Sequence, residues 1–128
     1  MTSVLFNKKS PLVVVPVSVK MESTVFDFNF AVDTGASVSL IDIDVMLAMG
    51  YKKADCIRTI ETVTASKRET AYEFMIDNIR AIGLIRRNFK VISRPLPIGL
   101  GIDGLLGLNF FKNKELTIDF KLSEIRLK

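Results

Sequence analysis

The sequence predicts an all-β fold, a small closed barrel or sandwich of mostly antiparallel strands with one or two short helices. Apolar residues occupy every second position in residues 12–20 and 24–32, which is the period of a half-buried strand. Residues 57–64 and 70–82 are rich in β-branched and aromatic side chains, which favour strands. A segment rich in proline and glycine, 95–104, then interrupts the chain before its last strands.

The first two strands are predicted to form a hairpin. Residues 21–23 are few enough to join residues 12–20 to residues 24–32 in a tight antiparallel turn. Pro16 has no backbone N–H to donate, so we expect it at an edge or a bulge of the sheet.

An extended segment at residues 37–41 is predicted to lead into the clearest early helix. Asp42 is a typical N-cap residue, and Gly50 is typical of the position after a helix end. The helix is therefore expected over residues 43–49.

The second half of the chain is predicted to begin with a long hairpin. Its arms are residues 57–64 and 70–82, and its polar tip is residues 65–68. The remaining elements are expected as a strand near residues 89–93, a short helix at 108–112, and a closing hairpin of residues 116–120 and 124–127.

Length and composition indicate one folded domain. The 128 residues are 48% hydrophobic and 25% charged, as is typical of a soluble globular protein, and we expect residues 1–128 to form a single domain. The longest apolar runs are too short to span a bilayer. We therefore expect no membrane contact, and either a cytoplasmic protein or a soluble domain excised from a longer protein, membrane-anchored or not.

The residue inventory excludes several chemistries. The chain has no histidine and one cysteine, Cys56, so it lacks the ligands of a structural zinc site and the base of a His-dependent triad. We expect no metal and no cofactor. The single thiol cannot form an internal disulfide, which favours a reducing compartment.

The full chain has a net charge of +4, and its positive charge is concentrated in the second half. Between Asp77 and Asp103 every charged side chain is basic: Arg80, Arg86, Arg87, Lys90 and Arg94. Such a run can form a basic stripe for nucleic acid or an acidic partner, or a solvated strand face. Phe89 is the one aromatic residue among them, which gives poor support for a stacking platform. We favour the solvated face and expect no nucleic acid.

One acidic residue closes an apolar strand. In the segment FAVDTGASVSLID, residues 30–42, Asp33 follows the second predicted strand. A carboxylate there is costly unless it is solvated, hydrogen-bonded or partly neutralised by a proton. Thr34 supplies a hydroxyl, Gly35 permits a turn, and Ala36 is small. Asp33 can therefore close an Asx-turn, or it can be a catalytic group.

The Asp-Thr-Gly-Ala segment after an apolar strand resembles the active-site motif of aspartic peptidases. A single copy in a short chain is similar to the retropepsin-like branch. Leu-Leu-Gly-Leu-Asn-Phe-Phe at residues 105–111 matches that family's late segment, which packs beside the active-site loop and leads into a short helix. The predicted hairpin between the two motifs lies where the family has its flap. The resemblance covers most of residues 11–128 and implies a barrel-like acid-protease fold.

The resemblance also implies a mechanism. Aspartic peptidases need two carboxylates that share one proton, and Asp33-Thr34-Gly35 is the only Asp-Thr/Ser-Gly in the chain. We therefore expect an aspartic endopeptidase that is active as a two-fold homodimer, with one catalytic Asp33 per subunit and a protein or peptide substrate. Thr34 would interlock the two loops, and Gly35 would admit the substrate backbone next to Ala36.

Pocket and flap residues follow from the same resemblance. The substrate pocket is expected to include Val32, Ile98 and Leu105, and the flap tip is expected at Ala65, Ser66 and Lys67. Family flaps usually carry a glycine near the tip, but none occurs here between Gly50 and Gly83. Leu108 also stands where retroviral members commonly have arginine.

Two other functions are compatible with the sequence. One is a noncatalytic dimeric module of the same fold that binds peptides or acts as a scaffold, which the glycine-free hairpin favours. The other is a basic β-barrel that binds nucleic acid through residues 80–94.

Overall fold

The structure, a computed structural model, describes residues 1–63 and 65–128. Its strands are β1 (Thr2–Leu5), β2 (Val14–Met21), β3 (Thr24–Val32), β4 (Leu40–Asp42), β5 (Arg58–Val63), β6 (Arg68–Ala81), β7 (Leu84–Arg94), β8 (Gly104–Leu106), β9 (Leu116–Asp119) and β10 (Glu124–Leu127). The helices are α1 (Ile43–Ala48) and α2 (Leu108–Phe111), with a 3₁₀ turn η1 (Lys53–Asp55). Among the described residues, no helix is long and apolar enough to cross a membrane.

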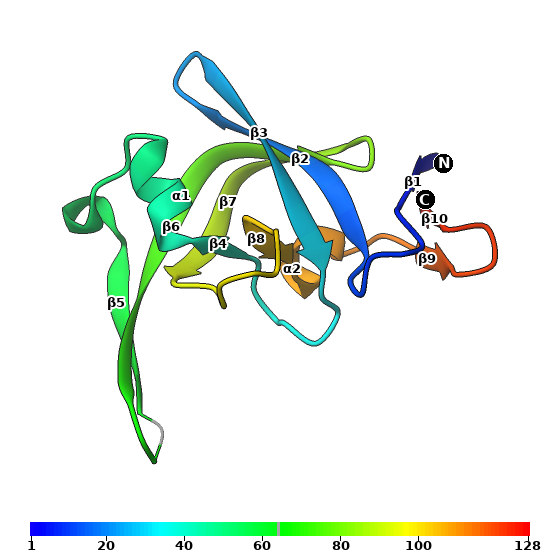
Figure 1. Cartoon of the computed structure of the whole chain (residues 1–128). Helices are drawn as coiled ribbons and strands as arrows, with labels where there is room; N and C mark the ends of the chain where they lie inside the picture. Colours follow the sequence, from blue (N-terminus) through cyan, green and yellow to red (C-terminus); the bar gives the residue numbers. More distant parts are fainter. Residues whose placement is uncertain (64) are drawn as a thin grey trace.

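Six strands close into a barrel. Hydrogen-bonded neighbours follow the order β2-β3-β8-β4-β7-β6, and β6 pairs with β2 to complete the ring. The β3–β8 and β4–β7 pairs are parallel, and the other pairs are antiparallel. Strand β6 is long and curved (Figure 1), so that its first half pairs with β5 outside the ring and its last residues pair with β2.

Both long strands change face at one point. Ile76 of β6 and Phe89 of β7 are paired and buried, but beyond this point the buried residue of β6 is Ile79, which pairs with Arg86. Asn88 has a φ of 49°, in the left-handed region that asparagine tolerates better than most residues. Because paired residues share a face, the switch turns Arg86 towards the inside and leaves Arg87 outside.

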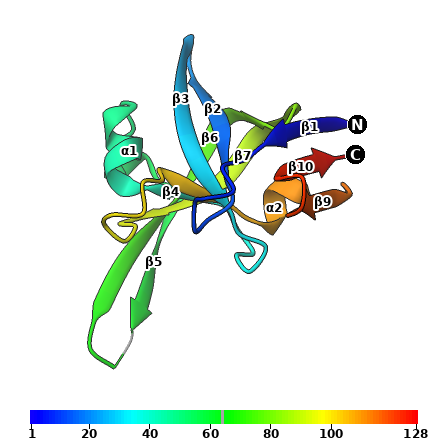
Figure 2. The ribbon, with the colours of Figure 1, turned by 45° about the vertical axis from the view of Figure 1, so that its right-hand side comes forward.

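The two ends of the chain form a separate small sheet. Strand β10 lies between β1 and β9 and is antiparallel to both, and the termini lie side by side in Figure 2. The Asp119 carboxylate accepts the backbone N–H groups of Leu122 (2.9 Å) and Lys121 (3.0 Å) in the β9–β10 turn. These bonds, first that from Leu122, together with Arg126 lower the pKa of Asp119, so its charge favours the closed turn.

Helix α1 begins at Ile43 as the sequence predicts, but it ends at Ala48, one residue earlier than expected, because Met49 is its C-cap. The Asp42 carboxylate accepts the N–H of Asp44 at 2.8 Å, which satisfies one of the free donors at the helix start. Gly50 has a φ of 107°, a conformation that side chains other than glycine rarely adopt.

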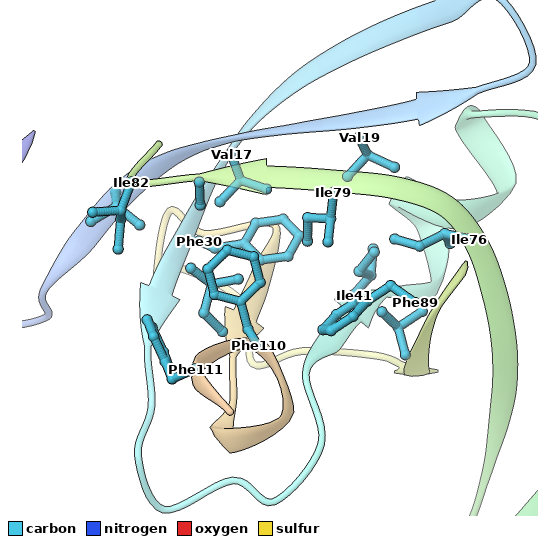
Figure 3. Packing of buried hydrophobic residues seen from close by; sticks show 14 of the residues in the cluster. Val17, Val19, Phe30, Ile41, Ile76, Ile79, Ile82, Phe89, Phe110 and Phe111 are labelled. Carbon is cyan, nitrogen blue, oxygen red and sulfur yellow. The ribbon is translucent and has the colours of Figure 1, made fainter. Parts of the chain in front are cut away.

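The core fills the barrel and extends below it to α2. Figure 3 shows side chains from β2, β3, β6, β7 and α2 pointing towards one another. Phe30 and Phe110 are completely buried, and Phe110 makes edge contacts with Phe89 and Phe111 at centroid distances of 6.0 and 5.2 Å. This packing fixes α2, and therefore the late Leu-Leu-Gly segment, against the end of β3.

The all-β fold class is confirmed, as are both short helices and the predicted hairpins. Pro16 lies where β2 pairs with β3 only, next to residues 17–20 that also pair with β6, so its missing donor costs no ladder bond. Thr64, the end of the predicted strand 57–64, lies outside the described residues.

Two further expectations about element bounds are wrong. Residues 37–39 are not a strand: the Ser39 N–H donates to the side chain of Asn109, and Ser39 reaches the neighbouring strand β7 only through its carbonyl, which accepts the Ile92 N–H. Strand β7 begins at Leu84, not near residue 89, because the turn at Ile82 and Gly83, with φ of 51° and 73°, has the geometry of a tight two-residue hairpin. Strands β1 and β8 were not expected from the sequence.

Removal of a buried aromatic ring should cost far more stability than removal of an exposed one. Phe30→Ala is expected to lower the free energy of unfolding by about 3–5 kcal/mol, because the cavity remains in a closed barrel. Phe120→Ala is the matched control, since Phe120 is 72% exposed, and its effect is expected to be below ~1 kcal/mol. Urea denaturation measures both. Equal losses would contradict this assignment of the core.

Candidate active site

Asp33 lies at the carboxyl end of β3, where the strand leaves the barrel. Val32 pairs with Leu106 in the parallel β3–β8 ladder, and the Asp33 N–H continues that ladder by donating to the Leu106 carbonyl at 2.9 Å. The backbone of Asp33 is therefore fixed by the late motif. Its side chain is half-buried.

The loop after β3 folds back on the Asp33 carboxylate. The Gly35 N–H donates to Asp33 Oδ1 at 2.9 Å, and the Ala36 N–H donates to the Asp33 carbonyl at 3.2 Å. A Cβ at Gly35 would lie 3.2 Å from the same Oδ1, closer than most side chains tolerate. The bond from the Gly35 N–H to Asp33 Oδ1 is that of an Asx-turn. It occupies one carboxylate oxygen, and within residues 1–63 and 65–128 the other oxygen accepts no hydrogen bond.

The late motif packs directly beside this loop, as the resemblance implied. The Leu108 N–H donates to the Ala36 carbonyl at 2.8 Å. A Cβ at Gly107 would come within 2.7 Å of that carbonyl oxygen and 2.8 Å of the Val38 backbone. Because backbone atoms cannot move aside as a flexible side chain can, glycine is required at position 107.

A buried polar pair that the sequence analysis missed locks the loop to α2. Ser39 is fully buried, and its hydroxyl and N–H both donate to Asn109 Oδ1, at 2.7 and 2.8 Å. The Ser39 hydroxyl also accepts the Gly107 N–H at 2.9 Å, and Asn109 Nδ2 donates to the Lys90 carbonyl at 2.9 Å. The two residues are 70 positions apart, so no local pattern in the sequence links them.

The Ser39–Asn109 pair also bears on Leu108, which stands where retroviral members commonly have arginine. The Leu108 side chain is 49% exposed, and its polar contact with the loop is made through its backbone N–H. The side-chain contact between late motif and loop comes from the next residue, Asn109.

The other predicted site residues differ in the element that carries them and in their exposure. Val32 and Leu105 are half-buried on neighbouring strands β3 and β8. Ile98 lies in the segment between β7 and β8, and its side chain is fully exposed. Thr34 is exposed, and its hydroxyl makes no hydrogen bond to any other described residue.

Strands β5 and β6 form a hairpin that projects from the barrel at the same end as the loop 33–39 (Figures 1 and 2). The predicted tip residues Ala65, Ser66 and Lys67 are exposed between these strands. Ion pairs cross the hairpin: Arg58 lies 3.0 Å from Glu73, and Arg68 lies 3.6 Å from Glu61. Glu73 is 8% exposed, so the first pair neutralises a carboxylate that burial would otherwise destabilise.

The basic residues between 80 and 94 do not form the continuous stripe that was the alternative to a solvated strand face. Arg86 turns inward, and its guanidinium donates to the carbonyls of Phe110 (2.9 Å) and Lys112 at the end of α2. Its charge stabilises unpaired carbonyls at a helix end. Arg86 therefore does not extend a basic stripe along this strand.

Comparison with known proteins agrees with this geometry. A family model described as "Aspartyl protease" matches residues 15–110, which include Asp33 and all but the last residue of the late motif, and the chain therefore belongs to the aspartyl protease family. The crystal structure of a retropepsin-like aspartic protease from Rickettsia conorii is similar, with a TM-score of 0.73 at 20% sequence identity over 98% of this chain and 87% of that one. This similarity shows that the fold is retropepsin-like. No curated protein matches the sequence.

Loss of the Ser39 hydroxyl should weaken the loop. Ser39→Ala is expected to lower the free energy of unfolding by about 1–3 kcal/mol, because the buried Gly107 N–H loses its acceptor. Ser37→Ala in the same loop is the matched control, since Ser37 is exposed, and it should change stability by less than ~0.5 kcal/mol. Thermal or urea unfolding compares the two. A Ser39→Ala variant as stable as Ser37→Ala would show that the pair does not hold the loop.

Proposed function

We propose that residues 1–128 form one retropepsin-like domain and that the protein is an aspartic endopeptidase, active as a homodimer with one Asp33 from each subunit. The observation that carries this proposal is the position of Asp33. It ends an apolar strand in a loop held by the late motif, with one carboxylate oxygen left without a hydrogen bond among the described residues. The sequence contains no second Asp-Thr/Ser-Gly.

The nearest similar sequence, Asp103-Gly104, has a different role. The Asp103 carboxylate accepts the Asn29 N–H at 3.0 Å, and its backbone bonds the Asn29 carbonyl and the Asp42 N–H. Asp103 thus ties β3 to β4. Because Asp103 already bonds barrel strands, the second carboxylate of a catalytic pair would come from a second subunit.

The reaction needs the two carboxylates in different protonation states. Two carboxyl groups about 3 Å apart do not both ionise, because their like charges would repel, as is established for aspartic peptidases in general. The ionised Asp33 would accept a proton from a water as the water attacks the peptide carbonyl, and the protonated Asp33 would donate to the carbonyl oxygen. The C–N bond of the resulting diol would then break as the first Asp33 passes its proton to the leaving nitrogen, and one diol hydroxyl would return a proton to the second Asp33, which restores the starting state.

The substrate would be an extended polypeptide. Exposed hairpins above a catalytic centre suit binding by strand addition, in which backbone bonds give affinity and side-chain pockets give selectivity. Val32, Leu105 and Ile98 are our candidates for pocket walls, with Ala65, Ser66 and Lys67 closing over the substrate. The exposed Thr34 hydroxyl would bond the opposite loop across the two-fold axis, and Gly35 would leave room for the substrate beside Ala36.

The β5–β6 hairpin supports one alternative, a noncatalytic dimeric module that binds peptides. A lid must change conformation to admit a substrate, but this hairpin has no glycine and carries two cross-strand ion pairs. A rigid hairpin suits a binding surface. Proteolysis by the purified protein separates this alternative from the peptidase.

Substitution at Asp33 tests catalysis directly. Asp33→Asn keeps the shape and the bond from Gly35 but removes the titrating group, and kcat on a peptide library is expected to fall by about 10²- to 10⁴-fold. Asp103→Asn is the matched control, because an amide oxygen can still accept the Asn29 N–H, and it should retain activity. Hydrolysis that survives Asp33→Asn, or that Asp103→Asn reduces equally, would overturn the proposal.

The pH dependence of peptide hydrolysis should be bell-shaped. Activity requires one proton on the pair, so it should fall at low pH when both carboxyls are protonated and at high pH when both are ionised. The two limits belong to the pair and not to either Asp33. A measurement of kcat/KM from acidic to neutral pH that shows no maximum would contradict a shared proton.

A further inference from the structure

A basic cavity lies on the outer face of the barrel, away from Asp33. Its volume is about 330 Å³, and its polar lining consists of Lys20, Arg80, Arg87, Ser18 and Asn78. Val25, at the start of β3, also lines it. Because β3 rises about 3.3 Å per residue, the eight residues from Val25 to Asp33 place the cavity roughly 26 Å from the candidate active site.

Strand register brings the three cations together. Asn78 of β6 is paired with Lys20 of β2 on one side and with Arg87 of β7 on the other. Arg80, two residues along β6, is paired with Ser18. Since neighbouring strands are about 4.8 Å apart and paired residues share a face, all three cations project from one small area of the sheet.

The positive charge of this area is only partly balanced by the protein. Among the described residues, Lys20, Arg80 and Arg87 make no ion pair. Two carboxylates near the edge of the area reduce its positive charge without cancelling it: Asp27 accepts the Ser18 hydroxyl at 2.9 Å, and Asp77 accepts the Glu22 N–H at 3.0 Å. Three cations that repel one another around a hollow favour an anion within it.

We infer that this cavity binds a small polyvalent phosphate anion. Two guanidinium groups offer the paired donors that match phosphate oxygens, and an ammonium adds a point charge. The Asn78 amide adds neutral donors. The volume is at the lower end of the range for small-ligand sites.

The cavity is less suited to a nucleic-acid strand. No aromatic side chain lines it, whereas single strands are held by stacking on aromatic rings. Arg86, which would extend the basic track along β7, is engaged inside with the end of α2. The surface therefore offers one compact site and not a continuous groove.

Titration with inorganic pyrophosphate, at ionic strength held constant with sodium chloride, tests the site. Isothermal calorimetry should show saturable binding at one site per chain. Arg80→Gln should weaken it at least about tenfold, because a charge-assisted bond to the anion is lost. Arg87→Gln is a second variant of the same design if Arg80→Gln does not fold. Lys8→Gln, at an exposed lysine outside the cavity, is the matched control and should bind as the wild type does.

A second arm identifies the source of the phosphate. Vesicles containing phosphatidic acid are compared with phosphatidylcholine vesicles, and Arg80-dependent binding of either pyrophosphate or phosphatidic acid supports the site. Three results would overturn it: no saturable binding, equal weakening by Lys8→Gln, or binding of a single-stranded oligonucleotide alone. Because the cavity lies far from Asp33, the binding assay gives its answer whether or not the protein cleaves peptides.

Discussion

A carboxylate at the end of an apolar strand is the constraint around which this barrel is arranged. The Asp33 backbone is held by the Leu106 carbonyl, and the loop behind it is held by Leu108 and by the buried Ser39–Asn109 pair. Each of these contacts joins residues about 70 positions apart in the chain. The loop is therefore stable only when the barrel is complete, which couples the geometry of Asp33 to the stability of the whole fold.

The parallel β3–β8 pair explains why the two motifs must be distant in sequence. Parallel strands cannot be joined by a tight turn, and the connection between them must cross the fold. Here the crossing consists of β4 to β7, which supply three further barrel strands (β4, β6 and β7) and the projecting hairpin of β5 and β6. The same segment thus closes the core around Phe30 and places the hairpin at the end of the barrel where Asp33 lies. Packing and the candidate site are served by one topological requirement.

The sequence predicts this fold well wherever a local pattern determines the structure. Alternating valines in β2 and the Asp42 cap of α1 have consequences within a few residues. Arg86 interrupts the alternation of apolar and polar residues in β7, because its charge is satisfied by carbonyls at the end of α2, 24 residues or more away. The first part of β7 could therefore not be predicted from the sequence. Strand β1 depends on pairing with β10 at the other end of the chain. Likewise, Asn109 is an ordinary polar residue until the fold brings Ser39 beside it.

The motifs of the active site could also be found in the sequence, because Asp-Thr-Gly and Leu-Leu-Gly are contiguous. Under the proposed function, the second carboxylate comes from a second chain, because Asp-Thr/Ser-Gly occurs once in the sequence. The proposed function therefore depends on an arrangement of two subunits, and the hairpin, braced by Arg58–Glu73, would have to admit a substrate between them. The phosphate cavity is independent of this requirement, since one chain supplies all of its cations.

The most direct test of the central claim is subunit mixing. Wild-type chains and inactive Asp33→Asn chains are refolded together in equal amounts, and peptide hydrolysis is compared with that of the same total concentration of wild-type chains. If each active site takes one Asp33 from each of two subunits, only dimers of two wild-type chains are active, and activity should fall to about one quarter. Activity of about one half, as expected when each chain works alone, would contradict the shared site.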